Sequence, residues 1–276
     1  GEVTALAAAG ALDPLDAIRL ARVRGVLMAE ASFAQPGAMT AVSAARPALE
    51  ALLAEWAAPV TIANHNAPSQ VVLAGATDAI ADVERRLAAA GIAAQRLAVA
   101  TAFHSPIVAP ACAPLAAALA GFAFAPARIP VYAHATAAPY PADPAAMRAQ
   151  LAAAIAAPVR FVDQLEALYA SGIRTFIAAG PGAALPRLIA RCLDGRPHLA
   201  VGLDAPGLHG VTAWHHALGA LAAAGVPLAF APLWEHEALP DDPAARAPAK
   251  LAVQITGANH GKPYPAAVEG AMPAPR

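Results

Sequence analysis

Apolar residues recur at helical spacing behind a cap signal near the start of the chain. Asp13 is a favoured cap residue, and Pro14 suits the first position of a helix. Leu20 and Met28 then fall on one face together with Arg24. The pattern predicts a helix that reaches at least residue 28 and places a guanidinium among apolar neighbours.

A compact run of short elements follows this helix. Period-two stretches predict strands over residues 37–43, 59–63, 70–74 and 92–99, and helical stretches lie over residues 46–56 and 77–89. The order βαββαβ is that of a ferredoxin-like domain. We therefore expect a ferredoxin-like subdomain over residues 37–102, inserted into a larger unit.

Helices and strands alternate again after this insert. We expect strands over residues 129–134 and 175–179, and helices over 109–119, 144–156, 160–170 and 214–224. Gly180-Pro181-Gly182 predicts a sharp turn into a helix that reaches Cys192. Such alternation favours a parallel sheet of the α/β class.

Composition narrows the kinds of partner. Charged residues make up 13% of the 276 residues, against about 25% in an average globular chain, and the net charge is −1. Without a basic block, we expect no nucleic-acid partner. Residues 105–127 carry no charge, but four prolines interrupt them, so we expect no membrane span. Two distant cysteines and the lack of a signal-peptide pattern favour the cytoplasm.

His104 is the first candidate for chemistry. It follows a predicted strand and precedes Ser105-Pro106, where the proline restricts the backbone and fixes the position of the imidazole. A structural histidine with satisfied hydrogen bonds is the competing interpretation, and spacing alone favours it.

Arg24 is the second candidate. A guanidinium among apolar side chains is costly unless an anion meets it. That anion is either a carboxylate of the same chain or the carboxylate of a ligand, which a guanidinium can bind bidentately. The sequence leaves both possibilities open.

Together these segments resemble the acyltransferase domains of type I polyketide synthases and polyunsaturated-fatty-acid synthases, and also malonyl-CoA:acyl-carrier-protein transacylases. The resemblance runs from Gly1 to about Trp234. The motifs that carry it stand in the family's order: Gly1-Glu2, Arg22-Val23-Arg24-Gly25, Gly37-Ala38-Met39, Asn66-Ala67-Pro68, Ala102-Phe103-His104-Ser105-Pro106, Pro158-Val159-Arg160-Phe161 and Gly180-Pro181-Gly182.

The resemblance implies a ping-pong transfer of a malonyl group from coenzyme A to the phosphopantetheine arm of an acyl carrier protein. His104 would activate a serine and protonate the leaving thiol. Arg24 would bind the free carboxylate of the malonyl group, Phe103 would leave little room for an α-methyl branch, and Asn66 would also contact the substrate. No permanently bound cofactor and no metal are expected.

Several positions depart from the family pattern. By the match, the nucleophilic serine would fall two positions before Gly1, and the oxyanion-hole glutamine further upstream. Ser105 is adjacent to His104 and cannot replace that serine. Ala154 stands where the family often has an amide, so we expect a backbone carbonyl to orient His104. Thr101 replaces a histidine that is often seen in malonyl-specific members.

The resemblance also sets the expected domain organisation. We expect an incomplete parallel-sheet, hydrolase-like large subdomain over residues 1–36 and 103–200 around the ferredoxin-like insert. A post-acyltransferase linker helix region would occupy residues 201–239 and a flexible interdomain linker residues 240–276. Without all its strands, the large subdomain should expose a sheet edge, and apolar surface near the N-terminus.

The expected partners are malonyl-CoA, an acyl carrier protein and neighbouring synthase domains. The alternative is a non-catalytic scaffold or carrier-protein docking segment of a megasynthase. An unrelated α/β-hydrolase fragment fits less well, because no clear triad acid follows His104.

Overall fold

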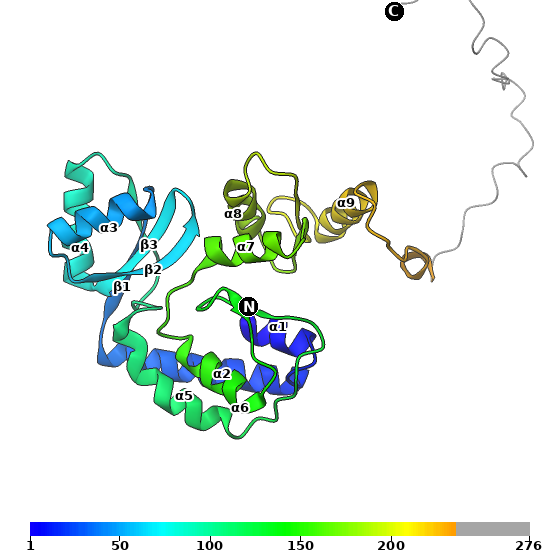
Figure 1. Ribbon diagram of the computed structural model, residues 1–276, viewed down its shortest axis with the longest axis horizontal. Helices are drawn as coiled ribbons and strands as arrows, with labels where there is room; N and C mark the ends of the chain where they lie inside the picture. Colours follow the sequence, from blue (N-terminus) through cyan, green and yellow to red (C-terminus); the bar gives the residue numbers. More distant parts are fainter. Residues whose placement is uncertain (236–276) are drawn as a thin grey trace, which may run out of the picture. The chain divides into compact units, whose positions relative to one another are not determined.

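The computed structural model describes residues 1–235 (Figure 1). Contacts divide the chain into one compact unit, Gly1–Val226, and a second unit that begins at Pro227. The α-helices are α1 (Glu2–Ala8), α2 (Pro14–Ala34), α3 (Arg46–Glu55), α4 (Thr77–Ala89), α5 (Cys112–Leu119), α6 (Pro144–Ala153), α7 (Phe161–Ala170), α8 (Ala184–Cys192) and α9 (Gly210–Ala223). Short 3₁₀ helices are η1 (Pro106–Ala111) and η2 (Ala231–Trp234). The strands are β1 (Gly37–Val42), β2 (Val60–Ala67), β3 (Gln70–Ala76), β4 (Ala94–Arg96), β5 (Tyr132–Ala133), β6 (Ala138–Pro139), β7 (Thr175–Ala178) and β8 (Leu199–Gly202).

The predicted order of elements βαββαβ is present from β1 to β4. These strands form one antiparallel sheet in the order β2-β3-β1-β4, and the helices between them begin and end within a few residues of the predicted bounds. Alternation along β1 and β3 sends successive side chains to opposite faces. One face packs against α3 and α4, which Figure 1 shows together above the sheet.

The opposite face of this sheet covers the segment that carries His104. Met39 of β1, Val72 of β3 and Ala63 of β2 form a small cluster with Ala102, and Phe103 packs against it. Gly37 lies closest to this segment, because a Cβ atom there would lie 2.7 Å from the backbone nitrogen of Ala102. The sheet therefore positions the residues just before His104.

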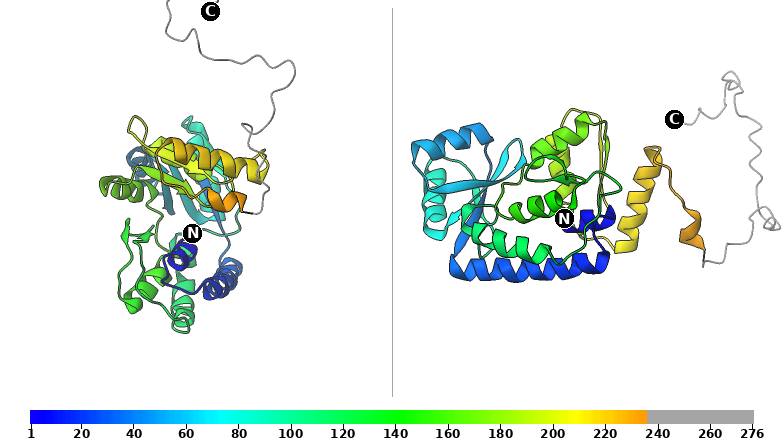
Figure 2. Two further views of the ribbon diagram at one scale, coloured as in Figure 1. Left: turned by 90° about the vertical axis from the view of Figure 1, so that its right-hand side faces the viewer. Right: turned by 60° about the horizontal axis from the view of Figure 1, so that its bottom comes forward.

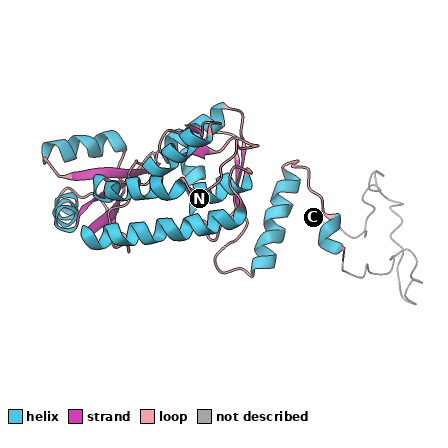
Figure 3. Cartoon of the chain, turned by 90° about the horizontal axis from the view of Figure 1, so that it is seen from below, coloured by secondary structure: helices cyan, strands magenta, loops and turns pink. Residues whose placement is uncertain are grey.

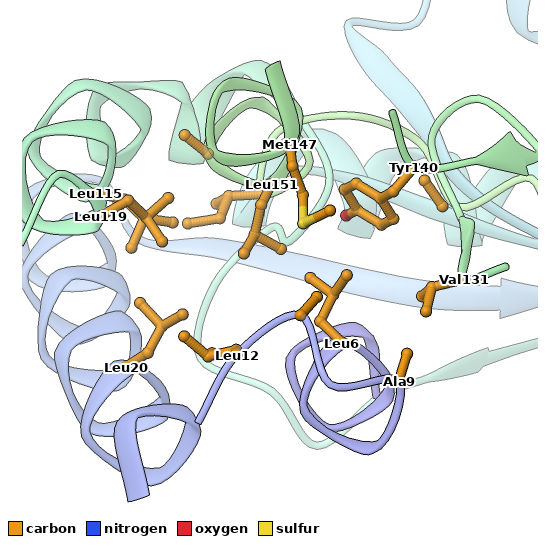
Figure 4. Packing of buried hydrophobic residues seen from close by; sticks show 14 of the residues in the cluster. Leu6, Ala9, Leu12, Leu20, Leu115, Leu119, Val131, Tyr140, Met147 and Leu151 are labelled. Carbon is orange, nitrogen blue, oxygen red and sulfur yellow. The ribbon is translucent and has the colours of Figure 1, made fainter. Parts of the chain in front are cut away.

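A second core gathers helices that precede and follow the ferredoxin-like segment in the sequence (Figure 4). Side chains of α1, α2, α5 and α6 meet there, with Leu6, Leu20, Leu119 and Met147 fully or almost fully buried. Helix α2 is the longest, with 21 residues, and runs beside α5 (Figure 2). The predicted cap is present, since the Asp13 carboxylate accepts hydrogen bonds from the first turn of α2.

Regular structure in the described chain is mainly helical, and the strands form short sheets (Figure 3). Strands β7 and β8 pair in parallel as a two-stranded sheet, packed against α7 and α8. This parallel pair and the antiparallel ferredoxin-like sheet together confirm the α/β class.

The expected apolar surface is also observed. On α2, four large apolar side chains are exposed: Leu15, Ile18, Val26 and Phe33. In the two-stranded sheet both strands are edges, and the Ile177 side chain of β7 is exposed.

Some sequence predictions were wrong. The strand expected over residues 129–134 shrinks to β5, which pairs with β6 in an antiparallel hairpin and joins no parallel sheet. Pro130 has no N–H to donate, and the Arg128 N–H bonds instead to the carbonyl of Ala9. Helix α1 and strand β8 were not predicted. Residues 154–156, predicted to be helical, do not continue α6.

Among residues 1–235, no helix is both long and apolar enough to cross a membrane. The linker predicted over residues 240–276, including a possible strand at 251–255, lies outside the described residues.

Candidate active site

A cleft of about 750 Å³ lies between α2 and the segment that ends at His104. This volume is in the range of pockets that bind small molecules. Its lining combines one basic side chain, one imidazole, several polar groups and apolar walls. The lining residues are Arg24, Gly25, Met28, Ala29, Ser32, Phe33, Met39, Asn64, Ala100, Thr101, Phe103 and His104.

His104 sits at a sharp bend before η1. Its φ is +57°, in the left-handed region that non-glycine residues rarely occupy. On its C-terminal side, Ser105 caps η1: its hydroxyl donates to the Ala102 carbonyl at 2.6 Å and accepts from the Ile107 N–H. Ser105 is 1% exposed. Its hydroxyl is thus committed to the bend, as expected for a serine that is not the nucleophile.

One contact defines the tautomer of His104. Its Nδ1 lies 3.0 Å from the carbonyl oxygen of Ala157. Because a carbonyl only accepts, Nδ1 carries the proton of the neutral ring, and Nε2 keeps its lone pair. The expectation that a backbone carbonyl would orient His104 is confirmed.

The surroundings keep this imidazole neutral. Burial, together with the charges of His134 and Arg24, lowers the pKa of His104 from its ordinary value of 6.5 to about 4. The carbonyls of Ala157 and Ala154 oppose the shift by accepting hydrogen bonds. At neutral pH, His104 is therefore a base able to accept a proton.

Arg24 faces the same cleft from α2. Its side chain is exposed, unlike those of Leu20 and Met28 on the same helix. No carboxylate within residues 1–235 forms an ion pair with it. Of the two anions left open by the sequence, the described structure provides no internal one.

Two further lining residues shape the wall beside His104. Phe103 is half-buried and packs against both the helical core and the sheet cluster. Thr101 is 2% exposed, and its hydroxyl has no hydrogen-bond partner within the described structure. A buried polar group without a partner is uncommon, which makes this hydroxyl an unsatisfied group at the wall of the cleft.

The structure brings Asn64 to the cleft, whereas Asn66 is not among the lining residues. Asn66 lies near the end of β2, and its carbonyl accepts a contact from the Cys192 thiol at 3.5 Å. The register of β2 against β3 shifts just before Asn64, after Ile62, and again between His65 and Ala67. A bulge interrupts the period-two alternation, so sequence spacing gives no guide to which asparagine faces the cleft.

The sequence did not single out the groups behind His104. The His134 ring lies edge-on to the His104 ring, with centroids 5.0 Å apart, and its Nδ1 contacts the Glu2 carboxylate at 3.0 Å. Glu2 and His134 are 132 residues apart. No local spacing or motif joins them, and only the tertiary fold brings them together.

Residues 1–235 contain no group of three histidine, cysteine or acidic side chains placed to hold a metal ion.

A family model described as "Acyl transferase domain" matches residues 1–227. The chain belongs to this family. The region matched by the family model contains every residue that lines the cleft.

Known relatives agree with membership of the acyl transferase family. The chain is 34% identical over 193 residues to "Polyketide synthase GfsA" of Streptomyces halstedii, covering 70% of this chain and 3% of that protein. It is 33% identical over 195 residues to "Malonyl CoA-acyl carrier protein transacylase" of Bacillus subtilis, covering 68% of this chain and 61% of that protein. The matched region thus spans less than two thirds of either relative.

A solved acyltransferase structure has the same fold. The acyltransferase domain from the second module of the salinomycin polyketide synthase superposes with a TM-score of 0.75 at 29% identity. The match covers 87% of this chain and 57% of that one. The acyl transferase family is thus supported by sequence and by structure.

Proposed function

We propose that this acyl transferase chain moves a malonyl group from coenzyme A to the phosphopantetheine arm of an acyl carrier protein. One observation carries the proposal: the Arg24 guanidinium and the His104 imidazole line one cleft. Arg24, a cation without a carboxylate partner among residues 1–235, matches the free carboxylate of a malonyl thioester. His104, a neutral base in the same cleft, matches its reacting carbonyl end.

In this proposal His104 works as a general base and then as a general acid. The Nε2 lone pair takes the proton of a serine hydroxyl, while the serine oxygen bonds to the malonyl carbonyl carbon. The bond from that carbon to the coenzyme A sulfur breaks, and the proton passes from Nε2 to the sulfur. The same steps in reverse transfer the malonyl group to the carrier thiol.

The nucleophile of this proposal is the serine that the resemblance places two positions before Gly1. Among the described residues that line the cleft, the serine is Ser32, whose hydroxyl donates to the Ala100 carbonyl at 3.0 Å. Ser105 is buried in its cap. Neither hydroxyl is free to attack in the described geometry.

Substrate choice would rest on the walls of the cleft. Arg24 would bind the malonyl carboxylate bidentately. The Phe103 ring would disfavour an α-methyl branch, a discrimination of about 1–3 kcal/mol for one methyl group. Asn66 remains a predicted substrate contact, while the position of Asn64 in the cleft lining supports a contact from that residue.

The proposal includes the partners implied by the family. Coenzyme A thioester and carrier phosphopantetheine are substrates, neighbouring synthase domains are partners, and the compartment is the cytoplasm. The relative from Bacillus subtilis is named as a malonyl CoA-acyl carrier protein transacylase, which supports the two substrates. Two unpaired cysteines support a reducing compartment.

The mechanism is tested by labelling with radioactive malonyl-CoA. This chain and a parent polypeptide extended upstream of Gly1 are incubated separately, and the labelled residue is mapped by mass spectrometry. We expect label on an upstream serine of the longer chain, and loss of that label in its His104→Ala variant. Label on Ser32 or Ser105 of the short chain would refute the serine assignment. No label on either chain would favour the scaffold alternative.

The role of Arg24 is tested by calorimetry on this chain with malonyl-CoA and acetyl-CoA. Arg24→Gln removes a charge-assisted hydrogen-bond donor, and we expect malonyl-CoA binding to weaken about ten- to a hundredfold. Acetyl-CoA lacks the free carboxylate, so its binding should not change. Arg22→Gln, on the same helix but outside the cleft lining, is the matched control. Equal weakening for both thioesters would contradict the assignment.

A further inference from the structure

Glu2 is a nearly enclosed carboxylate that accepts three hydrogen bonds. Its Oε1 accepts from the His134 backbone N–H at 2.6 Å and lies 3.0 Å from the His134 Nδ1. Its Oε2 accepts from the Tyr140 hydroxyl at 3.0 Å. The side chains of Glu2 and His134 are 18% and 16% exposed. These contacts use both carboxylate oxygens, and they join the first turn of α1 to the hairpin of β5 and β6.

The second nitrogen of His134 also faces an acceptor. Its Nε2 lies 3.1 Å from the carbonyl oxygen of Ala154. A neutral imidazole carries one proton, so one of the two contacts would then set lone pairs against each other. A ring protonated on both nitrogens satisfies both contacts.

The charge on Glu2 agrees with this assignment. Burial alone would raise the pKa of Glu2, but the hydrogen bonds and charge of His134 and the Tyr140 hydroxyl lower it overall. Glu2 is therefore an anion at neutral pH, and an anion at this distance stabilises an imidazolium.

We propose that Glu2 and His134 form a buried carboxylate–imidazolium pair that acts as a positioning element and keeps the neighbouring His104 neutral. The geometry of the two rings explains how the charge of His134 acts on His104. The His134 ring lies edge-on to the His104 ring, with centroids 5.0 Å apart and planes at 79°. A proton on His104 would place a second positive charge beside the first.

The groups that face His104 reinforce this effect. Arg24 is a second cation, and no carboxylate of residues 1–235 contacts the His104 ring. Glu2 binds the far partner, His134, together with Tyr140. His134 accordingly lowers the pKa of His104, second only to burial.

The consequence for catalysis rests on the proposed function. A histidine whose pKa is lowered releases a bound proton readily. The proton taken from the serine would pass quickly to the leaving coenzyme A sulfur, and the neutral ring would be restored for the second half of the transfer. The His134 pair thus acts through His104 and touches no substrate itself.

The charge assignment is tested on this chain by nuclear magnetic resonance, without substrate. Nitrogen and carbon shifts of the imidazoles are followed from pH 8 to pH 4. In the unmodified chain we expect His134 to be protonated on both nitrogens at pH 7 and His104 to be neutral. A neutral His134 at pH 7 would overturn the proposal without any substitution.

Two variants test the coupling between the rings. In His134→Asn the neighbouring charge is removed, and we expect the titration midpoint of His104 to rise by about one unit or more. In Glu2→Gln the imidazolium loses its anion, so we expect the midpoint of His104 to rise. His215→Asn, an exposed histidine of α9, is the matched control and should not change this midpoint. An unchanged His104 midpoint in a folded His134→Asn or Glu2→Gln chain would overturn the proposal.

These results are separable from the test of the proposed function. A chain that shows the expected titrations but transfers no malonyl group from any extended form keeps the ion pair and loses only its catalytic consequence. In an active extended form, His134→Asn should shift the acid limb of the kcat/KM profile to higher pH, with the direction set by the rise in the His104 midpoint. An unshifted limb would overturn the positioning role.

Discussion

At the scale of single residues, the cleft contains polar groups whose partners are incomplete. His104 has one ring nitrogen bonded to a carbonyl, Arg24 has no carboxylate partner within residues 1–235, and the Thr101 hydroxyl is buried without a hydrogen bond. The Thr101 hydroxyl costs free energy, since a buried polar group without a partner loses its hydration, whereas the exposed Arg24 keeps its hydration. Their convergence on one cleft is typical of a binding site.

Thr101 gives a prediction about stability. Thr101→Val keeps the shape of the side chain and removes the orphaned hydroxyl, so we expect the free energy of unfolding to rise by about 1 kcal/mol. Urea unfolding measures the change. Thr61→Val, on half-buried β2, is the control and should change stability less. A loss of stability in Thr101→Val would show that the hydroxyl has a partner in solution.

The residues of the site differ in how far the sequence predicts them. Arg24 and His104 were singled out because a guanidinium on an apolar helix face and a histidine before a proline are visible locally, and the structure places both in the cleft. Glu2 was noted only as part of the Gly1-Glu2 motif and His134 not at all, because the reason for their pairing is three-dimensional. Asn66 was chosen where Asn64 lines the cleft, since a bulge cannot be located from alternation alone.

At the scale of elements, β1 both builds the ferredoxin-like sheet and supports the site. Its register with β3 begins at Gly37, which pairs with Ala76. The absent side chain of Gly37 leaves room for the backbone of Ala102, two residues before His104. The strand therefore connects sheet packing to the bend that holds the imidazole.

Replacing Gly37 should disturb this contact. In Gly37→Ala the new Cβ would lie 2.7 Å from the Ala102 nitrogen and 2.8 Å from its Cβ, so we expect a loss of about 1–3 kcal/mol in the free energy of unfolding. Gly219→Ala, within exposed helix α9 and with no atom near its new Cβ, should instead gain about 0.5–1 kcal/mol.

Chemical denaturation of both variants measures these changes, and the His104 resonances report whether the bend has moved. A Gly37→Ala chain as stable as the parent, with unchanged His104 signals, would show that the strand does not fix the bend.

The elements themselves were predictable where their period is strong. The ferredoxin-like strands and helices follow from their hydrophobic periods, and α4 ends at the expected Ala89, although Thr77 is its first residue and not its cap. The sequence could not predict the short strands for a physical reason. Strand β5 has two residues and β8 has four, too few to show a hydrophobic period. Their pairing depends on which segments the fold brings beside them.

At the scale of the whole molecule, the buried titratable groups set how stability depends on pH. His104 has a pKa lowered from 6.5 to about 4 in the folded chain. As pH falls below 6.5, the unfolded chain gains a proton on this residue and the folded chain does not, so stability falls until about pH 4. Glu2, whose pKa is lowered, adds stability above its ordinary pKa, and this stability is lost as pH falls through the lowered value.

We therefore expect the free energy of unfolding to fall by about 2 kcal/mol between pH 7 and pH 5 through His104 alone. Urea unfolding at a series of pH values measures the slope. His104→Asn is the control, because asparagine tolerates a positive φ and does not titrate in this range. The same slope in the variant as in the parent would assign the loss to other groups.

The segment after α6 has a mechanical consequence for the two imidazoles. It carries the carbonyls of Ala154 and Ala157, one for each ring, and Val159 hydrogen-bonds to β2 through both its N–H and its carbonyl. Both imidazole rings therefore contact carbonyls of one segment, and that segment is itself hydrogen-bonded to β2. If this segment moves, we expect both rings to move with it. The distance between the rings should then change less than if each ring were bonded to a separate segment.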